Sequence, residues 1–151
     1  MAGAKRALAP LGAVAVLLAA GCGGGGSGSG PTKAEYVGQM KVIGQSLSTS
    51  LNTLGSATTP AKAATALQEV QVDLRGAADK LEAIKAPDPI KSQHADLVKA
   101  VRDFADELDP VIKDLQAGKM TALQAVPTLK GLTEIQTAST AISNKGYKIG
   151  G

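Results

Sequence analysis

The chain has 151 residues, and its 16 Lys and Arg against 13 Asp and Glu give a formal net charge of +3. Only 2% of the residues are aromatic, and no basic run with interleaved aromatic side chains occurs, which argues against nucleic-acid binding. One Cys and one His supply too few converging ligands for a zinc-type centre. We therefore expect no metal, no cofactor and no nucleic-acid partner.

Residues 1–21 have the pattern of a signal peptide. Lys5 and Arg6 form a positive n-region, and residues 7–20 form an apolar h-region that is short for a permanent membrane span. Removal of this segment takes away two positive charges. The remaining 14 basic and 13 acidic residues would then give a net charge of +1.

The signal ends in the run LAAGC, from Leu18 to Cys22, which resembles the lipobox of bacterial lipoproteins. The resemblance implies cleavage between Gly21 and Cys22, a diacylglyceryl group on the Cys22 thiol, and anchoring at the outer face of the cytoplasmic membrane. Ala19 departs from the family, which more often carries Leu there. The alternative is an ordinary secretory signal, which would leave Cys22 as a free thiol prone to intermolecular pairing.

Residues 22–31 carry the lipidated Cys22 and a Gly/Ser run whose composition predicts a flexible linker. About ten residues of such chain have a root-mean-square span of roughly 17 to 19 Å. The linker would therefore keep the folded part close to the membrane surface.

The first helix is predicted from Thr32 to Leu54. Thr32 and Glu35 form a capping-box pattern, apolar residues recur at steps of three and four, and Gly55 is a typical helix stop. The interior glycines Gly38 and Gly44 either allow close helix approach or mark looser packing.

The second helix is predicted from Pro60 to Ala86. Thr59 supplies an N-cap, Pro60 occupies the first helical position, and Pro87 ends the helix. Its apolar stripe follows an unbroken alternation of four- and three-residue steps. The stripe consists of Ala63, Leu67, Val70, Leu74, Ala77, Leu81 and Ile84.

The third helix is predicted to begin at Asp88-Pro89 and to end before Gly118. Its apolar stripe stays in phase across Pro110, although proline removes one helical hydrogen bond. We prefer one long helix with a kink near Asp109. The alternative is that Asp109 and Pro110 cap a separate short helix.

The fourth helix is predicted from Thr121 to about Ser143, with a capping box at Thr121 and Gln124 and with a kink or restart at Pro127. Residues 144–151 lose the apolar pattern and are expected to form a flexible tail. No segment alternates apolar and polar residues as a strand does.

Four helical segments with short connections predict an all-α, up-down four-helix bundle over residues 32–143. About 110 residues are enough for one modest core. An extended helical hairpin and a bundle completed by another chain remain as alternatives.

Chemistry-bearing residues are few in this bundle. His94 lies on the apolar stripe of the third helix, where it could gate a ligand or respond to pH, or could simply be a hydrogen-bonded core histidine. An acidic set suggests calcium but lacks the glycine-containing EF-hand loop, so a solvated face is the simpler interpretation. The set is Asp103, Asp106, Glu107, Asp109 and Asp114.

The segment from Ala86 to Leu108 resembles the helical domains of small actinobacterial lipoproteins, with a proline, a short gap, a histidine on the seam and leucines at helical spacing. The resemblance implies an envelope protein and transfers no site except Cys22. We expect a noncatalytic structural or interaction module with an envelope protein partner. The alternative is a binder of small ligands or lipids in a cavity between helices, where Gly38, Gly44, Ala63 and Ala77 would leave room.

Overall fold

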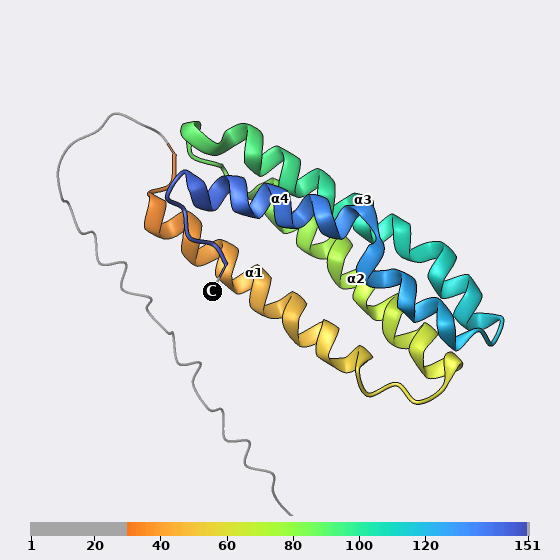
Figure 1. Cartoon of the computed structure of the whole chain (residues 1–151). Helices are drawn as coiled ribbons and strands as arrows, with labels where there is room; N and C mark the ends of the chain where they lie inside the picture. Colours follow the sequence, from red (N-terminus) through yellow and green to blue (C-terminus); the bar gives the residue numbers. More distant parts are fainter. Residues whose placement is uncertain (1–29, 151) are drawn as a thin grey trace, which may run out of the picture.

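The computed structural model describes residues 30–150 (Figure 1). The predicted signal peptide, Cys22 and all but the last two residues of the predicted linker lie outside this range. Between residues 30 and 150 every regular element is helical. The elements are α1 (Lys33–Leu54), α2 (Pro60–Ala83), η1 (Asp88–Ile90), α3 (Lys91–Gln116), η2 (Met120–Thr128) and α4 (Lys130–Asn144), of which η1 and η2 are 3₁₀-helices.

The helices form an all-α bundle, as the sequence predicts. In Figure 1, α2 and α3 make the central pair, α1 packs on α2, and α4 packs on α3. α3 is the most deeply packed helix and buries eleven residues. In contrast, Tyr36 and Met40 are the only buried residues among the α1 positions whose burial is described, so α1 is the most weakly embedded of the four helices.

The predicted helix caps at the starts of α1 and α2 are present. The Thr32 N–H donates to the Glu35 carboxylate at 2.7 Å, and the Glu35 N–H donates to Thr32 Oγ1 at 3.3 Å. Thr59 Oγ1 accepts the Lys62 N–H at 3.3 Å. These bonds satisfy N–H groups that a helix start would otherwise leave open.

α3 continues through Pro110 as one helix, so the alternative of a separate short helix is wrong. Leu108 and Val111, on either side of the proline, are both buried. The unbroken apolar phase therefore holds the helix together where one hydrogen bond is missing.

The segment before α4 differs from the prediction. Residues 120–128 form a 3₁₀-helix in place of an α-helix, while the restart after Pro127 is confirmed because α4 begins at Lys130. Leu123, Val126 and Leu129 are spaced by three residues, so a helix of three residues per turn places them on one side. All three are partly buried against the core.

The described part of the C-terminal tail also differs from the prediction of a flexible segment. Gly146 has φ +86°, a conformation that glycine adopts without strain, and it turns the chain back after α4. Tyr147 is then buried in the core and Ile149 packs against it. The tail is therefore a packed part of the bundle.

α3 and α4 approach each other closely at Gly131. A Cβ added to Gly131 would lie 2.5 Å from the backbone N and Cα of Phe104. Gly38 and Gly44, in contrast, have no non-local atom within 4 Å of such a Cβ. These two glycines thus mark open surface and not close packing.

Candidate functional site

His94 is buried and bridges three helices. Its Nε2 lies 2.9 Å from the carbonyl oxygen of Leu81 in α2, and its Nδ1 lies 2.9 Å from the hydroxyl of Tyr36 in α1. A carbonyl can only accept, so Nε2 carries the proton and Nδ1 accepts from the Tyr36 O–H. Both ring nitrogens are therefore already occupied.

The surroundings keep both groups neutral. Burial lowers the pKa of His94 below its ordinary value, and the hydrogen bond to Leu81 opposes this only in part. Burial also raises the pKa of Tyr36 to about 12, with a further contribution from Tyr147. The pair is therefore suited to joining helices and poorly suited to exchanging protons at neutral pH.

An aromatic cluster surrounds this bridge. The Tyr36 ring meets the rings of His94 and Tyr147 edge to face, with centroids 5.6 and 5.7 Å apart. The Lys33 ammonium lies 5.4 Å from the centroid of the Tyr147 ring, within cation–π range. The start of α1, the start of α3 and the C-terminal tail are thereby fastened together.

Gln71 makes a second buried polar contact, which the sequence did not predict. Gln71 of α2 donates through its amide to the Ala105 carbonyl at 2.7 Å and to the Asp109 carboxylate at 2.6 Å. It thus braces α3 directly before Pro110. The only signal in the sequence is its place beside Val70 on the interior side of α2.

The acidic set of α3 does not converge. Asp103, Asp106 and Asp114 pair with Lys99, Arg75 and Lys119 respectively. Glu107 accepts the Gly131 N–H at 2.8 Å, and Asp109 accepts from Gln71. In the described range, no three His, Cys, Asp or Glu side chains gather closely enough to hold a metal ion.

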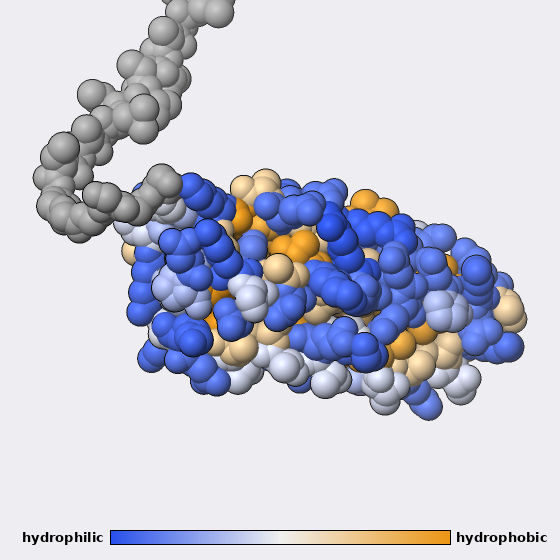
Figure 2. All heavy atoms as spheres, turned by 90° about the horizontal axis from the view of Figure 1, so that it is seen from above, coloured by the Kyte–Doolittle hydropathy of each residue, from blue (hydrophilic) through white to orange (hydrophobic). Residues whose placement is uncertain are grey.

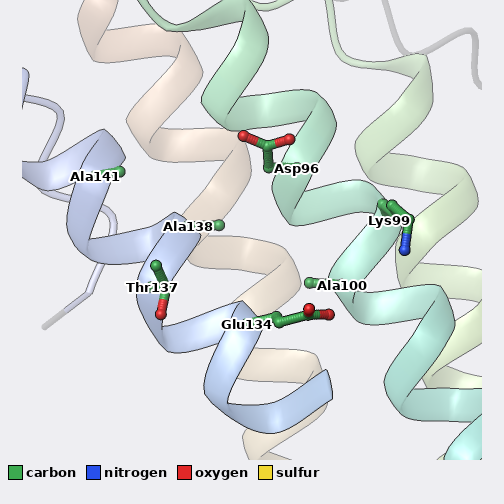
Figure 3. Close-up of a pocket in the computed structure, with 7 residues that line it drawn as sticks. All are labelled: Asp96, Lys99, Ala100, Glu134, Thr137, Ala138 and Ala141. Atoms are coloured by element: carbon green, nitrogen blue, oxygen red, sulfur yellow. The ribbon is translucent and has the colours of Figure 1, made fainter. Parts of the chain in front are cut away.

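A hollow of about 340 Å³ lies between α3 and α4 (Figure 3). Ala100, Ala138 and Ala141 border it, and the Glu134 side chain extends from α4 towards Ala100. The Glu134 carboxylate is already paired with Lys130 at 2.5 Å. Among residues 30–150, no buried side-chain N or O atom lacks a hydrogen-bond partner. The hollow therefore holds no buried polar atom left over to bind a ligand.

The surface mixes polar and apolar side chains. On the face shown in Figure 2, apolar groups emerge in small areas between hydrophilic ones. Large exposed apolar side chains include Val42 and Leu51 on α1 and Val72 on α2. Val42 and Val72 expose 63% and 66% of their surface, so neither contributes much to the core.

Cys22 and the predicted cleavage position at Gly21 lie outside the described residues. No helix within residues 30–150 combines the length and apolar character needed to cross a bilayer. Comparisons with protein-family models, curated proteins and solved structures give no match. The functional argument therefore depends on the residues of this chain alone.

Proposed function

We propose that the protein is a lipid-anchored lipoprotein of the cell envelope, and that its helical bundle is a noncatalytic structural or interaction module. The observation that carries this proposal is the ordered N-terminal pattern. A basic pair, a short apolar run and the LAAGC sequence ending in Cys22 precede the Gly/Ser segment. Two acyl chains on Cys22 would anchor the chain stably, whereas one chain binds only marginally.

The bundle supports a noncatalytic role. His94 is the only histidine, and its two ring nitrogens are engaged with Tyr36 and Leu81. A histidine that acts as a general base needs a free ring nitrogen within reach of substrate. Val42, Leu51 and Val72 are large apolar side chains that remain exposed on α1 and α2.

The ligand-binding alternative has less support. It requires an enclosed apolar cavity that His94 can reach, but the hollow beside His94 is open to the surface and is bordered by the charged residues Glu82, Lys99 and Arg102. Ala63 and Ala77 are buried, while Gly38 and Gly44 face open surface. The two glycines therefore do not open a space inside the bundle.

Substitution of the lipidation residue tests the anchor. Cys22→Ala in the full chain should abolish metabolic labelling with palmitate and move the protein from the membrane fraction to the soluble fraction, because the acceptor thiol is gone. Ser27→Ala is the matched control and should retain both label and membrane association. Membrane retention of Cys22→Ala equal to that of the control would overturn the proposed anchor. Crosslinking of the anchored protein in intact cells would then identify its neighbours.

A further inference from the structure

α1 is attached to the rest of the bundle at few points. Figure 1 shows it on the outside of the central pair, and it packs chiefly on α2. Its two buried residues among the described positions, Tyr36 and Met40, both lie in its first half. Separation of α1 from the other helices would therefore expose less apolar surface than unfolding of α2 and α3 would.

The attachment at Tyr36 passes through His94. The Tyr36 hydroxyl donates to His94 Nδ1 at 2.9 Å, and His94 Nε2 donates to the Leu81 carbonyl at 2.9 Å. The Tyr36 ring also meets the Tyr147 ring of the C-terminal tail edge to face. α1, the tail, α2 and α3 therefore meet at one buried cluster.

The second half of α1 has no comparable buried contact in the described structure. Ser50 Oγ donates to the Asp73 carboxylate of α2 at 2.5 Å, but this bond is exposed to water. Leu51 is 43% exposed. The cluster around Tyr36 is therefore the principal fastening of α1.

Release of α1 would change the surroundings of His94. Tyr36 contacts the Nδ1 side of the ring, so its departure would open that nitrogen to water. Burial lowers the pKa of His94 in the bundle, whereas in water the ring returns towards its ordinary value of 6.5. The released form therefore binds a proton more tightly, and acid shifts the balance towards it.

The charged groups beside His94 are already paired. Glu82 of α2 and Arg102 of α3 border the hollow next to His94 and form an ion pair at 2.6 Å. The other charged residues of this hollow are Lys99 and Asp103, which pair with each other, and Asp106, which pairs with Arg75. A protonated His94 would therefore find no vacant carboxylate in this hollow.

The charged groups on the other elements around His94 face water. Glu134 of α4 pairs with Lys130 and borders a different hollow, between α3 and α4. The exposed charged residues of α1, the α2–α3 connection, the start of α3 and the tail are Lys33, Glu35, Lys85, Asp88, Lys91, Asp96, Lys145 and Lys148. Solvent screens such groups, so burial has the largest effect on the pKa of His94.

We propose that α1 and the tail, residues 145–150, form a unit that acid releases from α2, α3 and α4 while these helices stay folded, with His94 as the latch. Below pH 6.5 each pH unit favours release by up to about tenfold, until the folded-state pKa is reached. α1 directly follows the Gly/Ser segment. Its release would therefore lengthen the chain before α2 by the 22 residues of α1.

The test measures amide hydrogen exchange in the full-length protein by mass spectrometry at pH 7.5 and 5.5. Each rate is divided by the intrinsic rate of an unprotected chain at the same pH, which leaves the equilibrium of opening. We expect opening near Tyr36 and near Tyr147 to increase together, by up to about tenfold, at the lower pH. Low concentrations of denaturant should hardly change this opening but should accelerate exchange in α3, because release exposes less surface than unfolding.

Two outcomes in the unmodified protein would overturn the proposal. One is equal exchange in α1 and α3 with the same dependence on denaturant, which would mean that the helices open together. The other is opening near Tyr36 that does not change between pH 7.5 and 5.5.

Matched variants assign the effect to the latch. His94→Gln keeps a polar side chain but does not titrate in this range, so it should remove the pH response near Tyr36. Glu82→Gln is the control, because it removes a carboxylate that borders the same hollow, and it should keep the response. A response that persists in His94→Gln and disappears in Glu82→Gln would overturn the role of His94.

A second measurement does not require a variant at His94. The protein has one histidine, so its ring gives a single NMR signal that reports protonation directly. Tyr147→Ala removes the edge contact with Tyr36 and should raise the midpoint of the His94 titration towards 6.5. An unchanged midpoint in Tyr147→Ala would overturn the coupling between the tail and the latch.

Discussion

At the scale of single residues, His94 makes folding stability depend on pH. Burial lowers its folded-state pKa below the ordinary 6.5, so the unfolded chain binds the proton more readily than the folded one. Protonation of Nδ1 also removes the acceptor of the Tyr36 O–H, which is buried. The neutral ring therefore contributes its full share to the free energy of unfolding above pH 6.5. This stabilisation is lost as the pH falls towards the folded-state pKa of His94.

Denaturant titrations between pH 7.5 and 5 should show this loss as a decline in the free energy of unfolding, of at most about 1.4 kcal/mol per pH unit for one proton. The exposed carboxyls of Glu35 and Asp88 have lowered pKa values, so they titrate below this range. His94→Leu removes the only histidine and should flatten the profile. An unchanged slope in that variant would contradict the assignment to His94.

At the scale of helices, two glycine substitutions should have opposite effects. Gly131→Ala places a methyl group 2.5 Å from the Phe104 backbone, which cannot yield as a flexible side chain can. We expect overpacking to cost about 1 to 3 kcal/mol of unfolding free energy. Thermal and denaturant unfolding would measure the loss.

Gly44→Ala is the matched control inside a helix. Its added methyl group meets no non-local atom within 4 Å, so the better helix propensity of Ala should raise stability by about 1 kcal/mol. If both variants shift the free energy of unfolding in the same direction, that result would contradict the close contact between Gly131 of α4 and Phe104 of α3.

Local sequence signals were sufficient to predict most of the helices. The caps at Thr32 and Thr59 and the in-phase stripe across Pro110 each depend on residues close in the chain, and all three are present. The 3₁₀ form of residues 120–128 was missed because Leu123 and Val126 fit an α-helical face almost as well as a three-residue repeat. Tertiary packing on α3 decides between them.

The polar contacts of the candidate site were less accessible to sequence reasoning. His94 was singled out because it interrupts an apolar stripe, but its partner Tyr36 lies 58 residues away. The burial of Tyr147 and the role of Gln71 likewise depend on how distant helices meet. No local periodicity contains that information.

At the scale of the whole molecule, stability should be distributed unevenly. α3 buries eleven residues, whereas α1 buries two and contacts chiefly α2. Local opening costs least where few apolar contacts are lost. Native-state hydrogen exchange should therefore be faster in α1 than in α2 and α3.

The aromatic contacts predict where α1 should be most protected. Amides near Tyr36 should exchange more slowly than those near Leu51, which is 43% exposed. Tyr147→Ala should accelerate exchange near Tyr36 and leave α3 unchanged, because the tail packs on the start of α1. Uniform exchange along α1 would contradict this distribution.

The fastening of Tyr36 by His94 and Tyr147 has a consequence for the order of assembly during synthesis. α1 is the first helix of the bundle to be made, yet Tyr36 contacts Tyr147, which lies 111 residues later in the sequence. A contact over such a sequence separation cannot form until the chain up to Tyr147 is available. The hairpin of α2 and α3 can pack as soon as Gln116 is available, but α1 acquires its full set of contacts only after Tyr147 has followed.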